Sequence, residues 1–463
     1  MRATILTLVA MAATLTAQPV DRTKPPQTPP IPEYKLPPVL DSTLPNGLHV
    51  VMVEDGRFPL ASIRLTFQAG SKYDPKDLPG LAESVGTLLI EGTKTRTARQ
   101  ISEEVDGLGG SLAGEAGADT LTVAASSLSE NLNQLLGLVA DVTRNATFPK
   151  DEVDLHKQNR QQSLLAQKAE PSFLAEQKFA EVVYGSSPYG HIAPTEASIA
   201  KLDTATLAKF RDAYMVPNNA TLLLVGKLRA REALLKTVTG LFGTWQRKDL
   251  PAAPKMEFPT PKRQIVLVDR PGSVQADIHV GRTAPTRLSP DYFPLVVGNQ
   301  VLGGGTNSRM FRDIREKEGF AYDAHSEYAT HRDGGDFQAV TEVRNDVLEP
   351  ALKAVLSEME QLAKEPVPAP ELTNIKNFVA GNYLLSLETQ DGLAGWLNRV
   401  QALGLPKDFL ETFVTRVRSV EPGQIEAAAK KYIAPDQAAI VIIGDSAKIG
   451  EVLKKFGEVK VVK

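Results

Sequence analysis

Residues 202–226 read LDTATLAKFRDAYMVPNNATLLLVG, and residues 420–444 read VEPGQIEAAAKKYIAPDQAAIVIIG. In each stretch apolar residues at helical spacing are followed by a proline turn and then by an apolar run that ends in glycine. Each stretch therefore predicts a helix followed by a buried strand. A tyrosine, a proline and a glycine recur at a constant offset of 218 positions. These pairs are Tyr214 and Tyr432, Pro217 and Pro435, and Gly226 and Gly444.

A second match lies earlier in each half of the chain. Residues 92–101 read GTKTRTARQI and residues 305–314 read GTNSRMFRDI, at an offset of 213 positions. Two offsets this similar indicate a tandem duplication. The repeated unit has about 200 residues, whereas the repeats of solenoid proteins have about 20–50.

The apolar patterns within each half predict an α+β fold. Strands that follow one another in sequence, with the helices grouped between them, favour a mixed or antiparallel sheet with helices packed on one face. The predicted strands are residues 48–54, 61–69, 120–126, 220–225, 264–268, 276–281 and 439–443. The predicted helices are residues 81–90, 98–108, 128–145, 151–169, 349–364 and 370–387.

Proline-rich stretches predict the domain boundaries, because proline fixes φ and cannot donate a backbone hydrogen bond. Residues 18–40 contain eight prolines and are predicted to be an extended linker. A second proline-rich stretch, residues 249–262, separates the halves. We therefore expect an N-terminal domain at 41–248 and a C-terminal domain at 263–463.

The N-terminus has the pattern of a secretory signal peptide. Arg2 precedes a short apolar stretch, and small residues follow up to Ala17. The alternative is a membrane anchor, but the stretch is shorter than the roughly 20 apolar residues that a span needs. No later stretch is apolar enough to span either. We predict that residues 1–17 are removed and that the protein is periplasmic or secreted.

Composition excludes several classes of function. The 463 residues carry a net charge of −3, so a nucleic-acid partner is not expected. Cysteine is absent, which rules out disulfides, thiolate zinc sites and a cysteine nucleophile. The six histidines include no two that lie three or four positions apart. Histidine spacing therefore does not predict a metal site.

Residues 78–92, LPGLAESVGTLLIEG, resemble the zinc-site helix of the pitrilysin/insulinase and mitochondrial processing peptidase family. The resemblance extends over nearly all of the predicted mature chain. It includes the turn LPNGLHVV at 44–51 and the stretch LGGGTNSRMFRDIREKEGFAY at 302–322. It implies two homologous halves that together form one half of a clam-shell peptidase.

The family motif His-x-x-Glu-His is degenerate in this chain. In the family the two histidines bind zinc and the glutamate is the general base. The matching positions here are Glu83, Gly86 and Thr87, and the third ligand of the family falls near Gln162 or Ser163. We therefore predict no metal and no cofactor in this chain, with zinc expected in a partner subunit.

The family's second active-site element, an arginine and a tyrosine seven residues apart, matches Arg315 and Tyr322. We expect Gly319 to end the helix that carries Arg315, and Tyr322 to share one face of the next strand with Ala324. A tyrosine hydroxyl or a guanidinium can donate hydrogen bonds to the carbonyl oxygen that gains charge during amide hydrolysis. The alternative is an arginine paired with a neighbouring glutamate, beside a core tyrosine.

The glycine run at 303–305 lacks the lysine and the serine or threonine of a phosphate loop. It is expected to form a turn before a helix at 309–317. Beside this turn, Gly304, Gly305, Ser308 and Arg309 are candidate substrate-binding residues.

The resemblance implies the non-zinc subunit of a heterodimeric periplasmic peptidase. Such a subunit is inactive alone and completes the substrate site of a homologous His-x-x-Glu-His partner that hydrolyses peptides or unfolded proteins. One alternative is a catalytically inactive scaffold or peptide-binding protein of the same fold. Another is a self-sufficient serine hydrolase, but residues 109–114, GGSLAG, lack the spacing of a nucleophile elbow.

Overall fold

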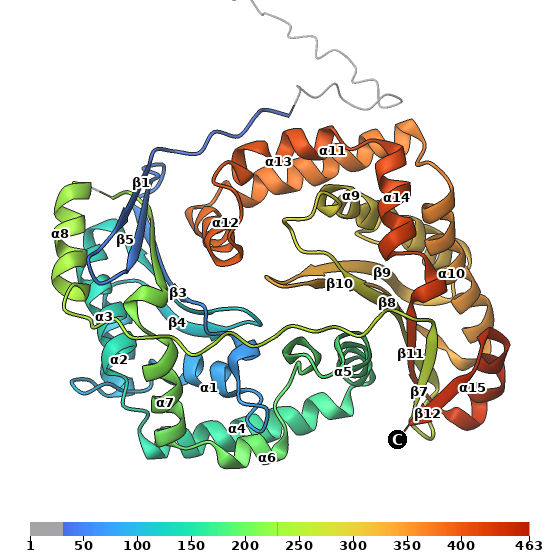
Figure 1. The fold of residues 1–463 in the computed structure, drawn as a ribbon, viewed down its shortest axis with the longest axis horizontal. Helices are drawn as coiled ribbons and strands as arrows, with labels where there is room; N and C mark the ends of the chain where they lie inside the picture. Colours follow the sequence, from blue (N-terminus) through green and yellow to red (C-terminus); the bar gives the residue numbers. More distant parts are fainter. Residues whose placement is uncertain (1–30, 229, 463) are drawn as a thin grey trace, which may run out of the picture. The chain divides into compact units, whose positions relative to one another are not determined.

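The computed structural model describes residues 31–228 and 230–462. The predicted signal peptide and residues 18–30 of the predicted linker lie outside the described residues. The chain divides into two units, Met1–Pro32 and Glu33–Lys463. The second unit contains both sheets and all of the helices described below (Figure 1).

The N-terminal half is built on a sheet with the strand order β1-β2-β6-β3-β5-β4. Strands β2 and β6 are parallel, and the other neighbours are antiparallel. The apolar residues of β3 that alternate with polar ones are fully buried, so this face of the sheet forms the main core. The strands are β1 (Val39–Thr43), β2 (His49–Glu54), β3 (Leu60–Phe67), β4 (Ser111–Ala116), β5 (Leu121–Leu128) and β6 (Ala220–Gly226).

The C-terminal half repeats this arrangement with the order β12-β7-β11-β8-β10-β9. Strands β7 and β11 are parallel, as are their counterparts β2 and β6. The outer strand differs, because β12 runs parallel to β7 whereas β1 runs antiparallel to β2. The strands are β7 (Gln264–Asp269), β8 (Gln275–Ala284), β9 (Ala321–Thr330), β10 (Gly335–Arg344), β11 (Ala439–Gly444) and β12 (Val459–Val462).

The described helices also divide between the two halves. Those of the N-terminal half are α1 (Leu81–Leu88), α2 (Ala98–Gly107), α3 (Leu132–Asn145), α4 (Lys150–Ala169), α5 (Pro171–Tyr184), α6 (Glu196–Lys201), α7 (Thr204–Tyr214) and α8 (Arg231–Phe242). Those of the C-terminal half are α9 (Tyr292–Leu302), α10 (Leu348–Lys364), α11 (Ala369–Ser386), α12 (Gln390–Leu403), α13 (Phe409–Arg418), α14 (Pro422–Tyr432) and α15 (Ser446–Leu453). Two shorter elements also matter for the site: the 3-10 helix η3 (Pro188–Gly190) and the π-helix η5 (Phe311–Lys317).

The two halves exchange one helix. Helix α5 follows α4 of the N-terminal half but packs on β8 and β11, and α12 of the C-terminal half packs on β3 and β6 (Figure 1). In each case the visiting helix covers the face opposite the sheet's own core. Phe179 of α5 contacts the β8 backbone near Gly281, and Asn398 of α12 lies 2.7 Å from the Thr66 hydroxyl of β3. Each sheet is thus covered by its own helices on one face and by one exchanged helix on the other.

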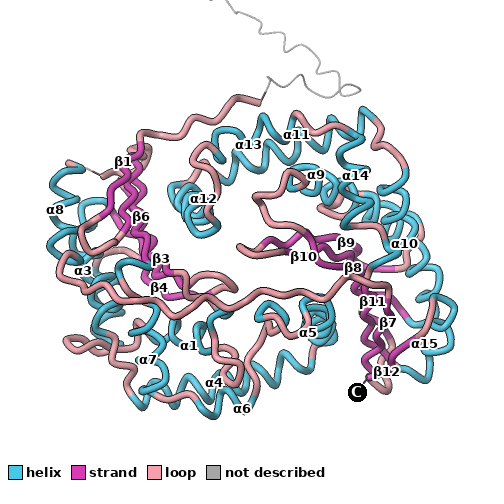
Figure 2. The backbone as a smooth tube through the Cα atoms, viewed as in Figure 1, coloured by secondary structure: helices cyan, strands magenta, loops and turns pink. Residues whose placement is uncertain are grey.

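The connection between the halves is a long loop. Residues 245–263 contain neither helix nor strand (Figure 2). Phe258 from this loop lies edge-on to the Tyr184 ring of α5, so the loop is packed against the exchanged helix. Among the described residues, no helix is long and apolar enough to cross a membrane.

Candidate functional site

The helix that resembles the zinc-site helix is α1. Asp74 accepts hydrogen bonds from the backbone N–H groups of Gly80 and Ala82, both at 2.8 Å, and so satisfies the start of the helix. Glu83, at the place of the first histidine of the family motif, accepts a hydrogen bond of 2.6 Å from the Arg160 guanidinium of α4. The cation that Glu83 contacts is therefore the guanidinium of Arg160.

The position of the family's general base is occupied by a close backbone contact. A Cβ atom added at Gly114 of β4 would lie 2.2 Å from the carbonyl oxygen of Gly86, and one added at Gly86 would lie 3.3 Å from the Glu115 backbone. Helix α1 and strand β4 can approach this closely because both residues are glycine. A longer side chain at Gly86 would require β4 to move.

The remaining groups near α1 do not suit a metal either. His156 of α4 lies 3.1 Å from the Ser84 hydroxyl, and burial, with a contribution from Arg160, lowers the pKa of His156 to about 4. The described residues contain no group of three or more histidine, aspartate or glutamate side chains placed to hold a metal ion. The side chains at the family's zinc positions therefore do not fit zinc.

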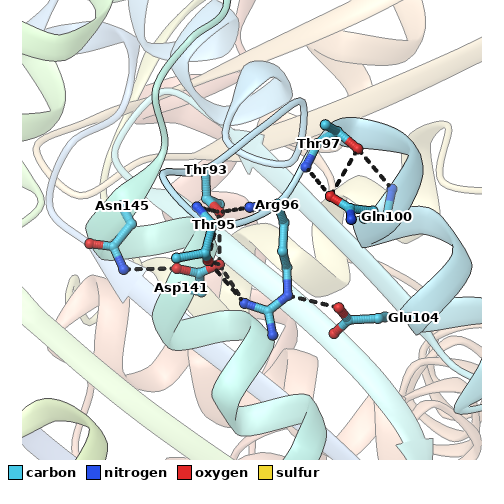
Figure 3. Close-up of polar contacts among 8 residues, drawn as sticks. All are labelled: Thr93, Thr95, Arg96, Thr97, Gln100, Glu104, Asp141 and Asn145. Carbon is cyan, nitrogen blue, oxygen red and sulfur yellow. Dashed lines mark hydrogen bonds and ion pairs between the residues drawn. The ribbon is translucent and has the colours of Figure 1, made fainter.

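The loop after α1 is anchored by a network of polar side chains (Figure 3). Asp141 of α3 is 8 % exposed and accepts hydrogen bonds of 2.8 Å from the Thr93 hydroxyl and the Arg96 guanidinium. Thr97 caps α2 through a reciprocal bond with Gln100. Burial would raise the pKa of Asp141, but these donors, together with Asn145 and Thr95, hold it below its usual value.

The repeated motif at 305–314 has a comparable anchor. Arg309, which matches Arg96, is 9 % exposed and donates two hydrogen bonds, of 2.8 and 3.0 Å, to the Glu371 carboxylate of α11. Ser308 is 1 % exposed, and its hydroxyl accepts a bond from the Phe311 backbone. The polar groups of these two candidate residues are thus used inside the chain, and the repeated arginine holds a loop to a helix in both halves.

Gly304 and Gly305 are placed differently. They line a cavity of about 540 Å³ beside strand β9, which is the outer strand of the second sheet. A Cβ atom at Gly304 would lie 2.7 Å from the Gln300 backbone, so a side chain does not fit there. The structure brings these two glycines to a cavity and leaves Ser308 and Arg309 in the packed interior.

Arg315 and Tyr322 lie in direct contact. The Arg315 guanidinium carbon is 4.6 Å from the centre of the Tyr322 ring and 4.5 Å from the centre of the Phe311 ring. The helix at 309–317 forms as expected but has π-type hydrogen bonding from 311 onward, and Gly319 follows it with a positive φ of 63°. The Tyr322 side chain is 85 % exposed.

A β-bulge sets the direction of Tyr322. Ala321 pairs with Val343 and Ala324 pairs with Thr341, so Tyr322 and Asp323 together oppose Glu342. The extra residue interrupts the alternation along β9. The expectation that Tyr322 and Ala324 share a face is therefore wrong. Ala324 is fully buried, whereas Tyr322 lies on the side of the sheet that α5 covers.

The alternative serine hydrolase has no support in the local geometry. Ser111 begins β4, and its hydroxyl lies 2.8 Å from the Ser126 hydroxyl of the neighbouring strand. A serine nucleophile requires a general base, usually histidine, within hydrogen-bond reach. The group within hydrogen-bond reach of the Ser111 hydroxyl is another serine, which is not such a base.

A buried polar cluster joins the halves close to this region. Lys72 is 3 % exposed and donates hydrogen bonds of 2.9 Å to Asp119 of the N-terminal half and Asp333 of the C-terminal half. Tyr189 of η3 and the Arg332 backbone also donate to Asp119, at 2.6 and 2.8 Å. Burial would raise the pKa of Asp119, but the Tyr189 hydroxyl and the Lys72 ammonium hold it below its usual value. We call these five residues the inter-half cluster.

A second buried contact links α5 to the second sheet. The Tyr184 hydroxyl donates a 2.6 Å hydrogen bond to Asp336 of β10. Burial raises the pKa of Asp336 to about 6, although the Tyr184 bond acts in the opposite direction.

Sequence reasoning missed several of these residues. Arg160 and Glu371 lie on predicted helices but have no local motif, because their partners are far away in the sequence. The polar side chains of Gln275, Asp277 and His279 alternate along β8, and this pattern does indicate a polar face on a strand. That face lines a cavity together with Tyr322.

These features define a class of protein: a metallopeptidase fold in two homologous halves, with a degenerate metal motif and an exposed tyrosine stacked on an arginine. Comparison with known proteins agrees. Residues 49–192 match the family model described as insulinase (peptidase family M16), and residues 201–379 match the one described as peptidase M16 inactive domain. The chain belongs to the peptidase M16 family, and its C-terminal half contains the domain that the family model describes as inactive.

Relatives and solved structures extend the match over most of the chain. An uncharacterized zinc protease of Bacillus subtilis is 23 % identical over 402 residues, which cover 86 % of this chain and 97 % of that protein. A peptidase M16 inactive domain from Pseudomonas fluorescens is 27 % identical, with a TM-score of 0.82 over 88 % of this chain and 98 % of that one. A protease from Helicobacter pylori has a TM-score of 0.82 at 21 % identity, over 88 % and 100 % of the two chains, and shows the fold alone.

Proposed function

We propose that this chain is the non-zinc subunit of a two-chain peptidase. Its partner is a homologous chain that carries the His-x-x-Glu-His motif, and its substrates are peptides or unfolded segments. In this proposal the pair works in the periplasm or outside the cell, which the signal-peptide pattern of residues 1–17 supports. The chain alone is inactive in this proposal, and its share of the site is the pair Arg315 and Tyr322.

The observation that carries the proposal is the contrast between two sites in one chain. At α1, the first position of the zinc motif is paired with Arg160 at 2.6 Å, and the place of the general base holds a glycine. At β9, Tyr322 is 85 % exposed and a guanidinium lies over the face of its ring. An exposed tyrosine can present both its apolar ring and its hydroxyl to a ligand or partner, which is why tyrosine is enriched at interfaces.

The pair has the chemistry that amide hydrolysis requires from a second subunit. The Tyr322 hydroxyl can donate a hydrogen bond to the carbonyl oxygen as it becomes negative, and one such donor contributes about 2.7–4 kcal/mol in other enzymes. The Arg315 guanidinium lies between the Phe311 and Tyr322 rings, so the ring stack restricts its position. An arginine held in this way has donors left for substrate carbonyls.

The test is peptide hydrolysis by the full chain alone, by the His-x-x-Glu-His chain of the same organism alone, and by the mixture. We expect activity in the mixture and at least a tenfold lower kcat with Tyr322→Phe, which corresponds to about 1.4 kcal/mol in the barrier. The matched control is Tyr432→Phe. Tyr432 lies on α14, away from the Arg315–Tyr322 pair, and its hydroxyl donates a hydrogen bond of 3.3 Å to Asp291.

Two results would contradict the proposal. One is partner activity that does not change when this chain is added. The other is a mixture in which Tyr322→Phe and Tyr432→Phe have the same activity as wild type. Either result would favour an inactive scaffold or peptide-binding protein of the same fold.

A further inference from the structure

Two arginines share one tryptophan ring at the place where the halves meet. Trp396 lies on the exchanged helix α12, which packs on β3 and β6 of the first sheet (Figure 1). The guanidinium carbon of Arg399, from the same helix, is 5.0 Å from the centre of the Trp396 ring. The guanidinium carbon of Arg287, from the loop between β8 and α9, is 5.8 Å from it. We call these three residues the arginine–tryptophan cluster.

Hydrogen bonds fix two members of the cluster in position. The Trp396 indole N–H donates a hydrogen bond of 2.7 Å to the Ser386 hydroxyl. Arg287 donates from Nε to the Thr330 hydroxyl and from Nη1 to the Tyr292 hydroxyl, both at 2.8 Å. Because Trp396 and Arg287 are already held in the chain alone, a ligand that binds here has to order few side chains, and this favours its affinity.

No carboxylate of the described chain balances the two positive charges. Neither Arg287 nor Arg399 forms an ion pair with any other described residue, whereas Arg309 is paired with Glu371. Partial burial, together with repulsion from Arg287, lowers the pKa of the Arg399 guanidinium. A bound anion would remove this repulsion, because it places an opposite charge beside both guanidiniums.

The two guanidiniums also have hydrogen-bond donors that no described residue uses. A guanidinium carries five N–H donors in a planar fork. Arg287 uses its Nε and Nη1, which leaves Nη2, and Arg399 makes no hydrogen bond with any other described residue. The Arg399 side chain is exposed, so a ligand can reach it. These donors match a carboxylate, which has only acceptors and binds a guanidinium through two parallel hydrogen bonds.

We infer that the arginine–tryptophan cluster binds a carboxylate of a peptide, from an acidic side chain or from the C-terminus. The inference rests on the proposed function for the identity of the ligand, because it assigns the anion to the peptide substrate of the two-chain peptidase. The cluster is separate from the Arg315–Tyr322 pair. Arg287 contacts Thr330 at the end of β9, whereas Tyr322 lies near the start of this strand, about 26 Å away along it.

The test uses the fluorescence of the cluster itself. Trp396 is one of two tryptophans, so Trp245→Phe leaves it as the only one. The full chain with this change is titrated with peptides of alanine, serine and glycine. Two of them have blocked ends and one central glutamate or glutamine, and a third has the central glutamine and a free C-terminal carboxylate. Trp396 emission reports binding at the cluster, and isothermal titration calorimetry gives the dissociation constants.

We expect at least one carboxylate peptide to change the Trp396 emission and to bind at least about tenfold more tightly than the blocked glutamine peptide, which is about 1.4 kcal/mol. Arg399→Gln should remove this preference and leave the affinity of the blocked glutamine peptide as it is. Arg399→Lys keeps the charge but loses the planar fork, so it should retain part of the preference. The matched control, Arg99→Gln, removes the same charge at a side chain that is 86 % exposed and paired with Glu103, and it should change neither affinity.

Three results would overturn the inference. One is equal binding of all three peptides, and another is a carboxylate preference that survives in Arg399→Gln. The third is binding of inorganic phosphate as tight as that of the carboxylate peptides, because the cluster would then recognise any small anion. A preference for the glutamate peptide assigns the ligand to an acidic side chain, and a preference for the free carboxylate assigns it to the C-terminus. Either preference supports the inference.

The outcomes also separate this inference from the proposed function. Equal binding of all three peptides overturns the inference even if Tyr322→Phe lowers hydrolysis in the mixed assay. A carboxylate preference that depends on Arg399, with no gain of hydrolysis in the mixture, supports the carboxylate site and rejects the two-chain peptidase.

Discussion

Replacing Lys72 by methionine tests how the inter-half cluster stabilises the chain. Lys72 donates two hydrogen bonds of 2.9 Å, one to Asp119 and one to Asp333, whose side chains are 9 % and 38 % exposed. A hydrogen bond to a charged group contributes about 1.5–3 kcal/mol when both partners are buried. The share of the more exposed Asp333 is smaller because water screens it.

The loss in Lys72→Met follows from these contacts. The variant leaves the buried Asp119 carboxylate without its countercharge, a change that typically costs about 3–5 kcal/mol. We expect the free energy of unfolding to fall by about 3 kcal/mol, and the variant Lys72→Met with Asp119→Asn to recover at least about 1 kcal/mol, because it removes the unpaired charge.

Urea unfolding is the assay. The chain has two tryptophans, Trp245 of the N-terminal half and Trp396 of α12, so fluorescence reports on both halves. The matched control is Lys201→Met, whose pair with Asp77 has side chains that are 53 % and 67 % exposed. Exposed pairs contribute about 0–1 kcal/mol. Equal losses in Lys72→Met and Lys201→Met would refute the argument that burial makes the cluster strong.

Three further predictions concern stability. Burial raises the pKa of Asp336 to about 6. The folded chain therefore favours the neutral carboxyl, and this contribution to stability is fully present below about pH 4. About 3 kcal/mol of the free energy of unfolding is lost as the pH rises through 6. Asp336→Asn should flatten this fall in urea titrations across that range, and an unchanged slope would contradict the assignment. Gly114→Ala should cost about 1–3 kcal/mol, because its Cβ would meet a carbonyl of α1 at 2.2 Å. Gly137→Ala should not destabilise the chain, because a Cβ atom there would have no atom within 4 Å. Similar melting temperatures for Gly114→Ala and Gly137→Ala would contradict the close contact between β4 and α1. Phe179→Ala should cost about 3–5 kcal/mol because α5 loses its ring contact with the second sheet. Phe378→Ala should cost far less, because Phe378 is 45 % exposed. Equal losses of stability in the two variants, measured by calorimetry, would contradict the packing of α5 on the second sheet.

Much of the fold follows from the sequence. The seven predicted strands correspond to β2, β3, β5, β6, β7, β8 and β11, and the duplication is confirmed by the matching strand orders. The strands that were missed are mainly outer ones, such as β4 (SLAGEA), which lacks β-branched residues. An outer strand has a neighbour on one side only, so its residues need not form a buried run.

The exchanged helices α5 and α12 were not predicted either. Pro171 begins α5 and is compatible with a first helical turn, but nothing in a local pattern states which sheet a helix will cover. The same limit applies to the candidate site. The family resemblance singled out Arg315 and Tyr322 as a pair, whereas the bulge that turns Tyr322 outward depends on its pairing with β10. Arg309 was a candidate for substrate contact because its partner Glu371, 62 positions away, could not be seen in the sequence.

The reciprocal placement of α5 and α12 has a consequence for the origin of the chain. A single half, separated from the other, would leave one face of its sheet uncovered and one helix with no sheet to cover. A second copy of the same half would supply both, in the manner of a domain-swapped homodimer. The present chain has the topology of such a dimer whose two subunits are joined by the loop at 245–263. Cutting this loop should leave two fragments that remain associated, since the exchanged helices, and not the covalent link, hold them together.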